Sequence, residues 1–163
     1  GDSAGGLTML KEKMKTSANI RTYLRKAHCH PQPRPLEGQL LVRLGVKAAI
    51  DISDGLVADL GHVCQSSNVS AFINTERLPL SPQLKQLFGA KAIRLALFGG
   101  EDYELLFTAP VKVVEKIKQE ISCPVTVIGE ITPDKSGKVT LLDHKGNILH
   151  WDRGGWEHFV SSR

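Results

Sequence analysis

Hydrophobic residues recur at helical spacing in several parts of the chain. In residues 4–15, Leu7, Leu10 and Met14 lie three or four positions apart, as on one face of a helix, with Ser3 placed to cap it. A second helix is predicted over residues 18–27, and a third over residues 36–44, where Pro35 opens the helix and Gly45 ends it. The spacing predicts further helices that begin near residues 56 and 82, and over residues 90–98 and 110–121.

Shorter apolar or alternating runs separate these helices and predict strands. The predicted strands cover residues 48–52, 69–74, 103–108, 125–131, 139–142 and 148–151. The last two flank a turn at residues 144–147, which is typical of a hairpin. Helices and strands alternate irregularly, and this order indicates an α+β fold with mixed α/β layers. A helical bundle and a regular doubly wound sheet both fit the pattern less well.

Length and composition favour one globular domain. The chain has 163 residues, of which 41% are hydrophobic and 23% are charged, and this is ordinary globular usage. No apolar stretch approaches the roughly 18 residues of a membrane-spanning helix. Lys11, Lys13 and Lys15 interrupt the first stretch where a secretory signal would be apolar. We therefore expect a cytoplasmic protein with no membrane partner.

Cysteine usage and charge narrow the candidate partners. Cys29, Cys64 and Cys123 are odd in number and have no C-x-x-C spacing, so we expect reduced thiols. The net charge of +4 suits anionic ligands, but the basic residues are scattered and predict no nucleic-acid partner. The chain starts with Gly1 instead of Met, which we interpret as a segment of a longer protein.

The densest polar motif is Asp51-Ile52-Ser53-Asp54-Gly55, between a predicted strand and a predicted helix. Ligands collect beyond the carboxyl ends of strands, and helix N-termini offer N–H groups to phosphate oxygens. Asp51 and Asp54 would hold a hard cation such as Mg²⁺, while Ser53 and the Gly55 backbone would approach the phosphates. The structural alternative is that Ser53 or Asp54 caps the helix and that Asp51 is a solvated strand end.

Two further motifs combine glycines with chemistry-bearing side chains. The segment Gly99-Gly100-Glu101-Asp102-Tyr103-Glu104 places acids after two glycines, which allows close approach of a ligand or, alternatively, ends a helix. Within it, Glu104 is expected to be structural or partly paired instead of free. The segment at residues 154–159 carries Trp156, whose indole would stack on a flat cationic ligand or fold back onto the core.

Two suggestive patterns are set aside. The opening Gly1-Asp2-Ser3-Ala4-Gly5-Gly6 is superficially like the nucleophile segment of trypsin-like proteases, but an alanine intervenes and no all-β pattern supplies the partners. His28, Cys29 and His30 lack a second ligand pair at zinc-like spacing, so we expect them to be structural.

Taken together, four segments resemble the C-terminal domain of the thiamine-monophosphate kinase family. They are residues 1–7, 31–34, 51–56 and 99–108, they follow the family's order, and the tail around Trp156 fits as well. The resemblance implies the C-terminal fold of the aminoimidazole-ribonucleotide-synthetase superfamily, a layered sheet with helices that is partly ferredoxin-like. It also implies that residues 1–163 form a single domain and that the family's N-terminal ATP- and Mg²⁺-binding domain is absent.

The resemblance further implies transfer of the γ-phosphoryl group of ATP to thiamine monophosphate, giving thiamine diphosphate, with Mg²⁺. Asp51 and Asp54 would be metal ligands, Ser53 would contact ATP, and Glu101 and Trp156 would bind thiamine monophosphate. No residue of the chain is assigned as a catalytic acid or base, because the acceptor is already a phosphate. The isolated chain would be inactive, and the full-length protein would form a homodimer through the missing N-terminal domain.

Two alternatives stay open. The chain could belong to another ATP-dependent member of the superfamily, such as aminoimidazole ribonucleotide synthetase, selenophosphate synthetase or the hydrogenase-maturation dehydratase. It could also be a binding module that kept the fold without the chemistry. The motifs at residues 51–55 and 99–104 favour the thiamine family, and the intact acids within them speak against a module.

Overall fold

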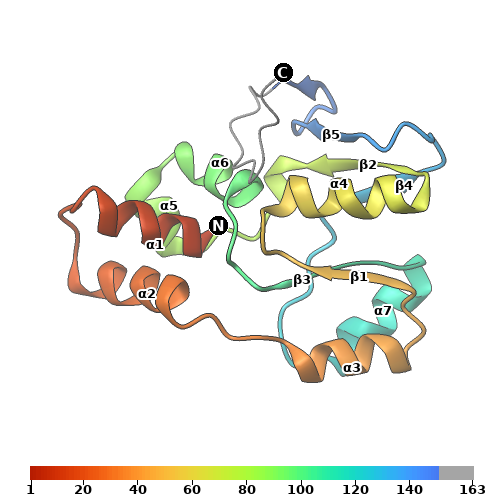
Figure 1. Ribbon diagram of the computed structural model, residues 1–163, viewed down its shortest axis with the longest axis horizontal. Coiled ribbons are helices and arrows are strands. Elements are labelled where there is room, and N and C mark those ends of the chain that lie inside the picture. The colour runs from red at the N-terminus through yellow and green to blue at the C-terminus, as the bar shows by residue number, and fades with distance from the viewer. Residues whose placement is uncertain (151–163) are drawn as a thin grey trace, which may run out of the picture.

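The computed structural model describes residues 1–150, so Trp156 lies outside the described residues. The helices are α1 (Asp2–Lys11), α2 (Ala18–Cys29), α3 (Pro35–Arg43), α4 (Leu56–Ser67), η1 (Thr75–Arg77), α5 (Pro82–Phe88), α6 (Lys91–Phe98) and α7 (Val111–Glu120). The strands are β1 (Ala48–Asp51), β2 (Ser70–Asn74), β3 (Leu105–Thr108), β4 (Gly129–Thr132), β5 (Val139–Leu142) and β6 (Ile148–Leu149). The expected α+β fold with mixed layers is confirmed (Figure 1).

The strands form two separate sheets. β1 and β3 pair antiparallel, with Ala48 opposite Thr108 and Asp51 opposite Leu105. The second sheet has the order β4-β2-β5-β6, in which β2 and β5 run parallel while the other pairs are antiparallel. Helix α4 lies between the two sheets in Figure 1. The predicted hairpin is confirmed as β5 and β6, and Gly146 in its turn has a φ of +81°.

Helix α4 and the larger sheet share one hydrophobic core. Leu56, Leu60 and Cys64 repeat along one face of α4, and this face packs against Ala71 and Ile73 of β2. Strand β2 lies between β4 and β5 in its sheet, and Ala71 and Ile73 are buried while Phe72, on the opposite face, is exposed. This core fixes the position of α4, and therefore of the loop that precedes it.

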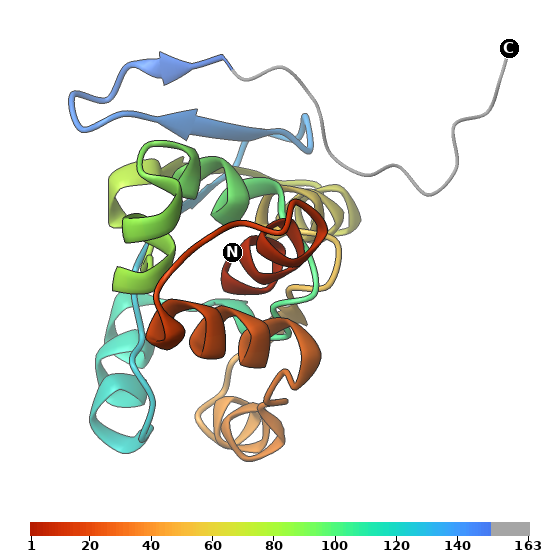
Figure 2. The same ribbon diagram turned by 90° about the vertical axis from the view of Figure 1, so that its left-hand side faces the viewer.

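The N-terminal helices share a second core with α5 and α6. Its buried members are Met9, Ile20, Leu24, Leu84 and Ala92. Helices α1 and α2 lie side by side, as Figure 2 shows, and they approach closely at Gly6. A Cβ atom on Gly6 would lie 2.2 Å from the carbonyl oxygen of Leu24, so only glycine fits there.

Two predicted strands are shorter than the sequence pattern suggests. The strand predicted over residues 125–131 forms only from Gly129, because its partner β2 ends at Asn74 and the chain then turns into η1. The strand predicted from residue 103 starts at Leu105, because Tyr103 has a φ of +51° that breaks the extended backbone. The alternation of apolar and polar residues in the sequence does not reveal where either strand begins.

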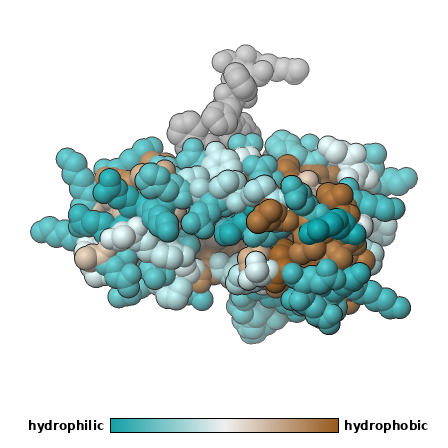
Figure 3. Space-filling model, turned by 90° about the horizontal axis from the view of Figure 1, so that it is seen from below, coloured by the Kyte–Doolittle hydropathy of each residue, from teal (hydrophilic) through white to brown (hydrophobic). Residues whose placement is uncertain are grey.

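The face that Figure 3 shows carries an apolar region on the side of α3 and α7. Leu36, Val42 and Val111 on these helices are each more than 70% exposed. Within residues 1–150, no helix is both long and apolar enough to span a lipid bilayer.

The close approach of α1 and α2 predicts opposite effects for two glycine substitutions. Gly6→Ala is expected to lower the free energy of unfolding by about 1–3 kcal/mol, because the new methyl group overlaps the Leu24 carbonyl. Gly61→Ala, in α4 with open space around it, is the matched control and is expected to raise it by up to about 1 kcal/mol. Urea unfolding of the chain measures both, and equal effects would contradict the packing described.

Candidate functional site

The two polar motifs of the sequence meet at one end of the β1–β3 pair. Because β1 and β3 are antiparallel, the end of β1 lies beside the start of β3, and the flanking loops run together. The Glu101 N–H donates to the Ser53 carbonyl at 2.8 Å, and the Tyr103 N–H donates to the Ile52 carbonyl at 2.9 Å. The loop at residues 52–55 and the loop at residues 99–104 therefore form one structural unit.

Two glycines allow this contact. A Cβ atom on Gly100 would lie 2.2 Å from the carbonyl oxygen of Ser53. Gly55 has a φ of +131°, and a Cβ there would lie 3.0 Å from the carbonyl group of Phe98. At both positions a glycine is needed, because the backbones approach too closely for a side chain. The sequence did not predict this contact between backbones for Gly55 or for Gly100.

A buried carboxylate organises the first loop. Asp59 is only 2% exposed, and its Oδ2 accepts hydrogen bonds from the N–H groups of Ser53, Asp54 and Gly55, at 3.0, 3.1 and 3.1 Å. These donors lie before the N-terminus of α4, where backbone N–H groups lack helical partners and favour negative charge.

This arrangement corrects two expectations. The Gly55 backbone was expected to approach the phosphates, but its N–H already donates to Asp59, as does the N–H of Ser53. The predicted contact of Ser53 with ATP stays a prediction. The alternative, in which the side chain of Ser53 or Asp54 caps α4, is also wrong. The N-cap residue is Gly55, which has no side chain to accept a hydrogen bond from the first turn. An acid in the first turn of a helix is the sequence signal that could have identified Asp59.

One group of side chains within residues 1–150 has the spacing of a metal site. Ligand atoms of Asp54, Asp59 and His62 all lie within 4.8 Å of one another. Asp54 and His62 are exposed and Asp59 is buried. Asp51, which the resemblance pairs with Asp54, is exposed at the end of β1 and does not belong to this group. The metal-binding role of Asp51 stays a prediction.

Glu101 lies in the second loop on a constrained backbone. Its φ is +63°, an uncommon value for a residue other than glycine, and its side chain is 56% exposed. The carboxylate oxygen Oε2 lies 3.5 Å from Nδ1 of His28, and the same nitrogen lies 3.1 Å from the Ser3 hydroxyl. The sequence offered no signal that would join these three residues, which come from three separate elements.

The other acids of the second loop hold the structure. Asp102 accepts hydrogen bonds from the backbone nitrogens of Gly1 and Ser3, so it caps α1, which begins at Asp2 and not after a Ser3 cap as predicted. Glu104 is paired, as expected: Arg34 donates to it from Nε at 2.9 Å and from Nη2 at 2.7 Å. Glu104 thereby raises the pKa of the Arg34 guanidinium, mainly through these hydrogen bonds. The Pro-rich motif that precedes α3 is thus tied to the site.

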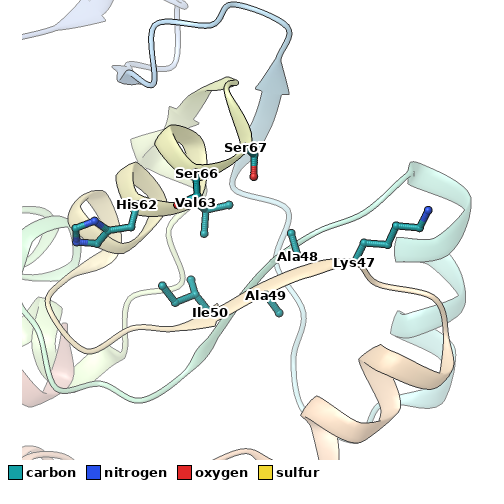
Figure 4. Close-up of a pocket in the computed structure, with 8 residues that line it drawn as sticks. All are labelled: Lys47, Ala48, Ala49, Ile50, His62, Val63, Ser66 and Ser67. Atoms are coloured by element: carbon teal, nitrogen blue, oxygen red, sulfur yellow. The ribbon is translucent and has the colours of Figure 1, made fainter.

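An open groove of about 270 Å³ begins next to this site, between β1 and α4 (Figure 4). Ala48, Ala49 and Ile50 line it from β1, and His62 and Val63 line it from α4. His62 is the one residue that the groove shares with the metal-like group. Among the residues that the structure describes, Asp51, Ser53, Asp54 and Glu101 do not line the groove.

Comparison with known proteins agrees with this geometry. Residues 2–142 match the family described as AIR synthase related protein, C-terminal domain. The chain is 39% identical over 166 residues to thiamine-monophosphate kinase of Escherichia coli K12, covering 99% of this chain and 50% of that protein. It thus spans about half the length of the curated relatives it matches.

Solved structures give the same result. Thiamine-monophosphate kinase from Stenotrophomonas maltophilia K279a superposes with a TM-score of 0.77 at 36% identity, over 86% of this chain and 46% of that one. A structure described as AaThiL complexed with AMPPCP and TMP gives a TM-score of 0.75 at 34% identity, over 97% of this chain and 48% of that one. The chain belongs to the family of AIR synthase related protein C-terminal domains.

Proposed function

We propose that this chain is the C-terminal half of a thiamine-phosphate kinase, which transfers the γ-phosphoryl group of ATP to thiamine monophosphate. The observation that carries the proposal is the hydrogen-bonded pairing of the loops at residues 52–55 and 99–104. This pairing joins a group of cation-binding carboxylates to Glu101, an exposed acid suited to a cationic substrate. The structure described as a complex with AMPPCP and TMP, at 34% identity, supports this choice of ligands.

The proposed reaction does not need a strong general base. The acceptor is a phosphate oxygen, which is already ionised, so catalysis depends on alignment of donor and acceptor and on neutralisation of clustered negative charge. In phosphoryl transfer these tasks fall to positioned side chains and metal ions. The absence of a predicted catalytic acid or base among the assigned residues is compatible with this reaction.

The residues present fit Mg²⁺ through their oxygens. Asp54 offers an exposed carboxylate, and Asp59 keeps a second carboxylate oxygen beside the one that accepts the three N–H groups. We propose that Asp51 adds a third carboxylate. Hard cations prefer such oxygen ligands over an imidazole, so we assign His62 no ligand role. When bound, the ion would neutralise charge on the phosphates of ATP.

The remaining assignments concern the two substrates. We propose that Ser53 contacts ATP with its side chain, since its N–H is engaged by Asp59. We propose that Glu101 binds thiamine monophosphate and that the Trp156 indole stacks on the cationic thiazolium ring. Glu101 faces solvent and has the charge for this role.

We propose that a further domain contributes to this site. Because the chain spans about half the length of its curated relatives, we propose that an N-terminal domain completes the ATP and Mg²⁺ sites and forms a homodimer. The described cysteines are all free thiols, which suits our proposal that the protein works in the cytoplasm.

A chimeric enzyme tests the proposed reaction. We define the two-domain enzyme as the N-terminal half of the Escherichia coli relative joined to this chain. It is expected to form thiamine diphosphate from ATP, Mg²⁺ and thiamine monophosphate, whereas the isolated chain is expected to form none. Asp54→Asn in this enzyme should lower kcat by about 100-fold or more, because one metal-binding carboxylate is lost. Glu130→Gln removes one charge from β4 in the other sheet and should leave kcat unchanged.

The activity assay tests the proposal once two controls are met. The chimera must unfold cooperatively on heating, which shows that it is folded, and it must bind Mg²⁺-ATP. A folded chimera that ignores thiamine monophosphate in calorimetry would overturn the substrate assignment. Tight binding of a purine intermediate in its place would favour another member of the superfamily.

The substrate assignment predicts a selective effect at Trp156. Trp156→Ala in the two-domain enzyme should raise the Kd for thiamine monophosphate about tenfold, because the indole face attracts a cation. Trp156→Phe keeps an aromatic face and should retain most of the affinity. Calorimetric titration measures both variants, and the Kd for Mg²⁺-ATP serves as the internal control. An equal loss for both ligands would indicate that the substitution acts on the fold instead.

The position of Asp59 predicts a coupled effect on stability and ATP binding. Asp59→Asn conserves volume but removes the charge that three N–H groups face, so it should lower the free energy of unfolding of the chain by about 1–3 kcal/mol. In the two-domain enzyme it should also weaken Mg²⁺-ATP binding. Urea unfolding and calorimetry check the two effects. Wild-type values for both would show that the carboxylate does not organise this loop.

A further inference from the structure

Ser3, His28 and Glu101 form a chain of contacts beside the proposed substrate site. Nδ1 of His28 lies 3.1 Å from the Ser3 hydroxyl and 3.5 Å from Oε2 of Glu101. Exposure to solvent increases from Ser3 to Glu101. Ser3 is 1% exposed as a residue, the His28 side chain is 20% exposed and the Glu101 side chain is 56% exposed. A buried hydroxyl is thus connected through an imidazole to a carboxylate that faces solvent.

The geometry excludes a nucleophilic triad. In a Ser-His-acid triad the serine and the acid occupy different ring nitrogens, so that the imidazole passes a proton between them. Here both contacts are made to Nδ1 of His28. Ser3 is also too buried to reach a substrate. The arrangement is therefore suited to holding a side chain in place and not to proton relay.

His28 itself is held from two sides. Helix α1 carries Ser3, and α1 is anchored by Asp102, a neighbour of Glu101 in the same loop. The glycine contact between α1 and α2 lies next to His28, since a Cβ on Gly6 would be 3.0 Å from the His28 Cβ. The imidazole thus has little room to move relative to the loop at residues 99–104.

Glu101 is fixed at its backbone but less so at its carboxylate. Its N–H donates to the Ser53 carbonyl, and its φ of +63° is maintained by the surrounding contacts. A glutamate side chain that is half exposed would otherwise sample several rotamers, and binding would have to restrict it. A contact that selects one rotamer in advance reduces this cost.

We propose that His28 is a positioning residue that orients the Glu101 carboxylate for binding the cationic ring of the substrate, with Ser3 holding the imidazole. This inference rests on the proposed function of Glu101. With a proton on Nδ1, the ring N–H donates to the Ser3 hydroxyl at 3.1 Å and presents its positive end to the Glu101 carboxylate at ion-pair distance, 3.5 Å. The sequence motif Gly1–Gly6, set aside as a protease segment, thereby gains a role in supporting the substrate site.

The ring form of His28 tests the contact in the chain by itself. Long-range ¹H–¹⁵N correlation spectra of the 163-residue chain near neutral pH are expected to show His28 with a proton on Nδ1. Glu101→Gln should shift the His28 ring resonances, and His30, which is exposed two residues further on, should not respond. A His28 ring with bare Nδ1, unchanged by Glu101→Gln, would overturn the positioning role whatever the protein's activity.

A double-mutant cycle in the two-domain enzyme tests the consequence. His28→Ala should raise KM for thiamine monophosphate about fivefold, with kcat and KM for ATP unchanged. His28→Asn should restore most of the affinity, because its amide N–H takes the place of the Nδ1 proton. His30→Ala is the matched control on the same helix end and should have no effect.

The cycle also distinguishes the positioning role of His28 from the proposed substrate-binding role of Glu101. In the Glu101→Gln background, His28→Ala should cause no further loss, because there is no carboxylate left to orient. Full additivity would overturn the positioning role. If Glu101→Gln alone leaves KM for thiamine monophosphate unchanged, the proposed function of Glu101 fails, while the ring spectra still decide whether His28 and Glu101 interact.

Discussion

The antiparallel pairing of β1 with β3 is the constraint on which the site depends. These two short strands bring the loop at residues 52–55 beside the loop at residues 99–104, which follows more than 40 residues later in the sequence. The pair is flanked by α4, whose apolar face is fixed by the core it shares with β2. A change that separated β1 from β3 would separate the loop that carries Asp54 from the loop that carries Glu101, and it would displace Asp51, which is paired with Leu105 at the end of β1.

Several acids near this junction serve the fold and leave fewer for ligands. Asp59 accepts the N–H groups before α4, Asp102 accepts those at the start of α1, and Glu104 is bound by Arg34. Each satisfies a charge or a set of donors that would be costly to leave unpaired. The exposed carboxylates that remain are those of Asp51 at the end of β1 and of Asp54 and Glu101 in the two loops, together with Glu104, whose charge is paired. The structure thus separates carboxylates that are bound within the fold from exposed carboxylates, and Asp59 is the one buried acid to which we also propose a role in holding Mg²⁺.

Backbone strain is concentrated in the second loop. Glu101 and Tyr103 both have positive φ, and the loop is held on three sides by hydrogen bonds to Ser53 and Ile52 and by the cap on α1. Strained conformations persist only where the surroundings determine them, and they are common where a side chain must be presented to a ligand. The positive φ of Glu101 therefore fits the substrate-binding role that we propose for it.

The sequence by itself determined the order of helices and strands, the α+β class and the motifs that carry the family resemblance. These features depend on local periodicity, on turn residues such as Pro35 and Gly45, and on short segments. Only the tertiary structure decided the partners: which acid accepts the N–H groups before α4, where the strands at Leu105 and Gly129 begin, and that His28 meets Glu101. Such contacts join residues far apart in the chain, and no local pattern contains the distances between them.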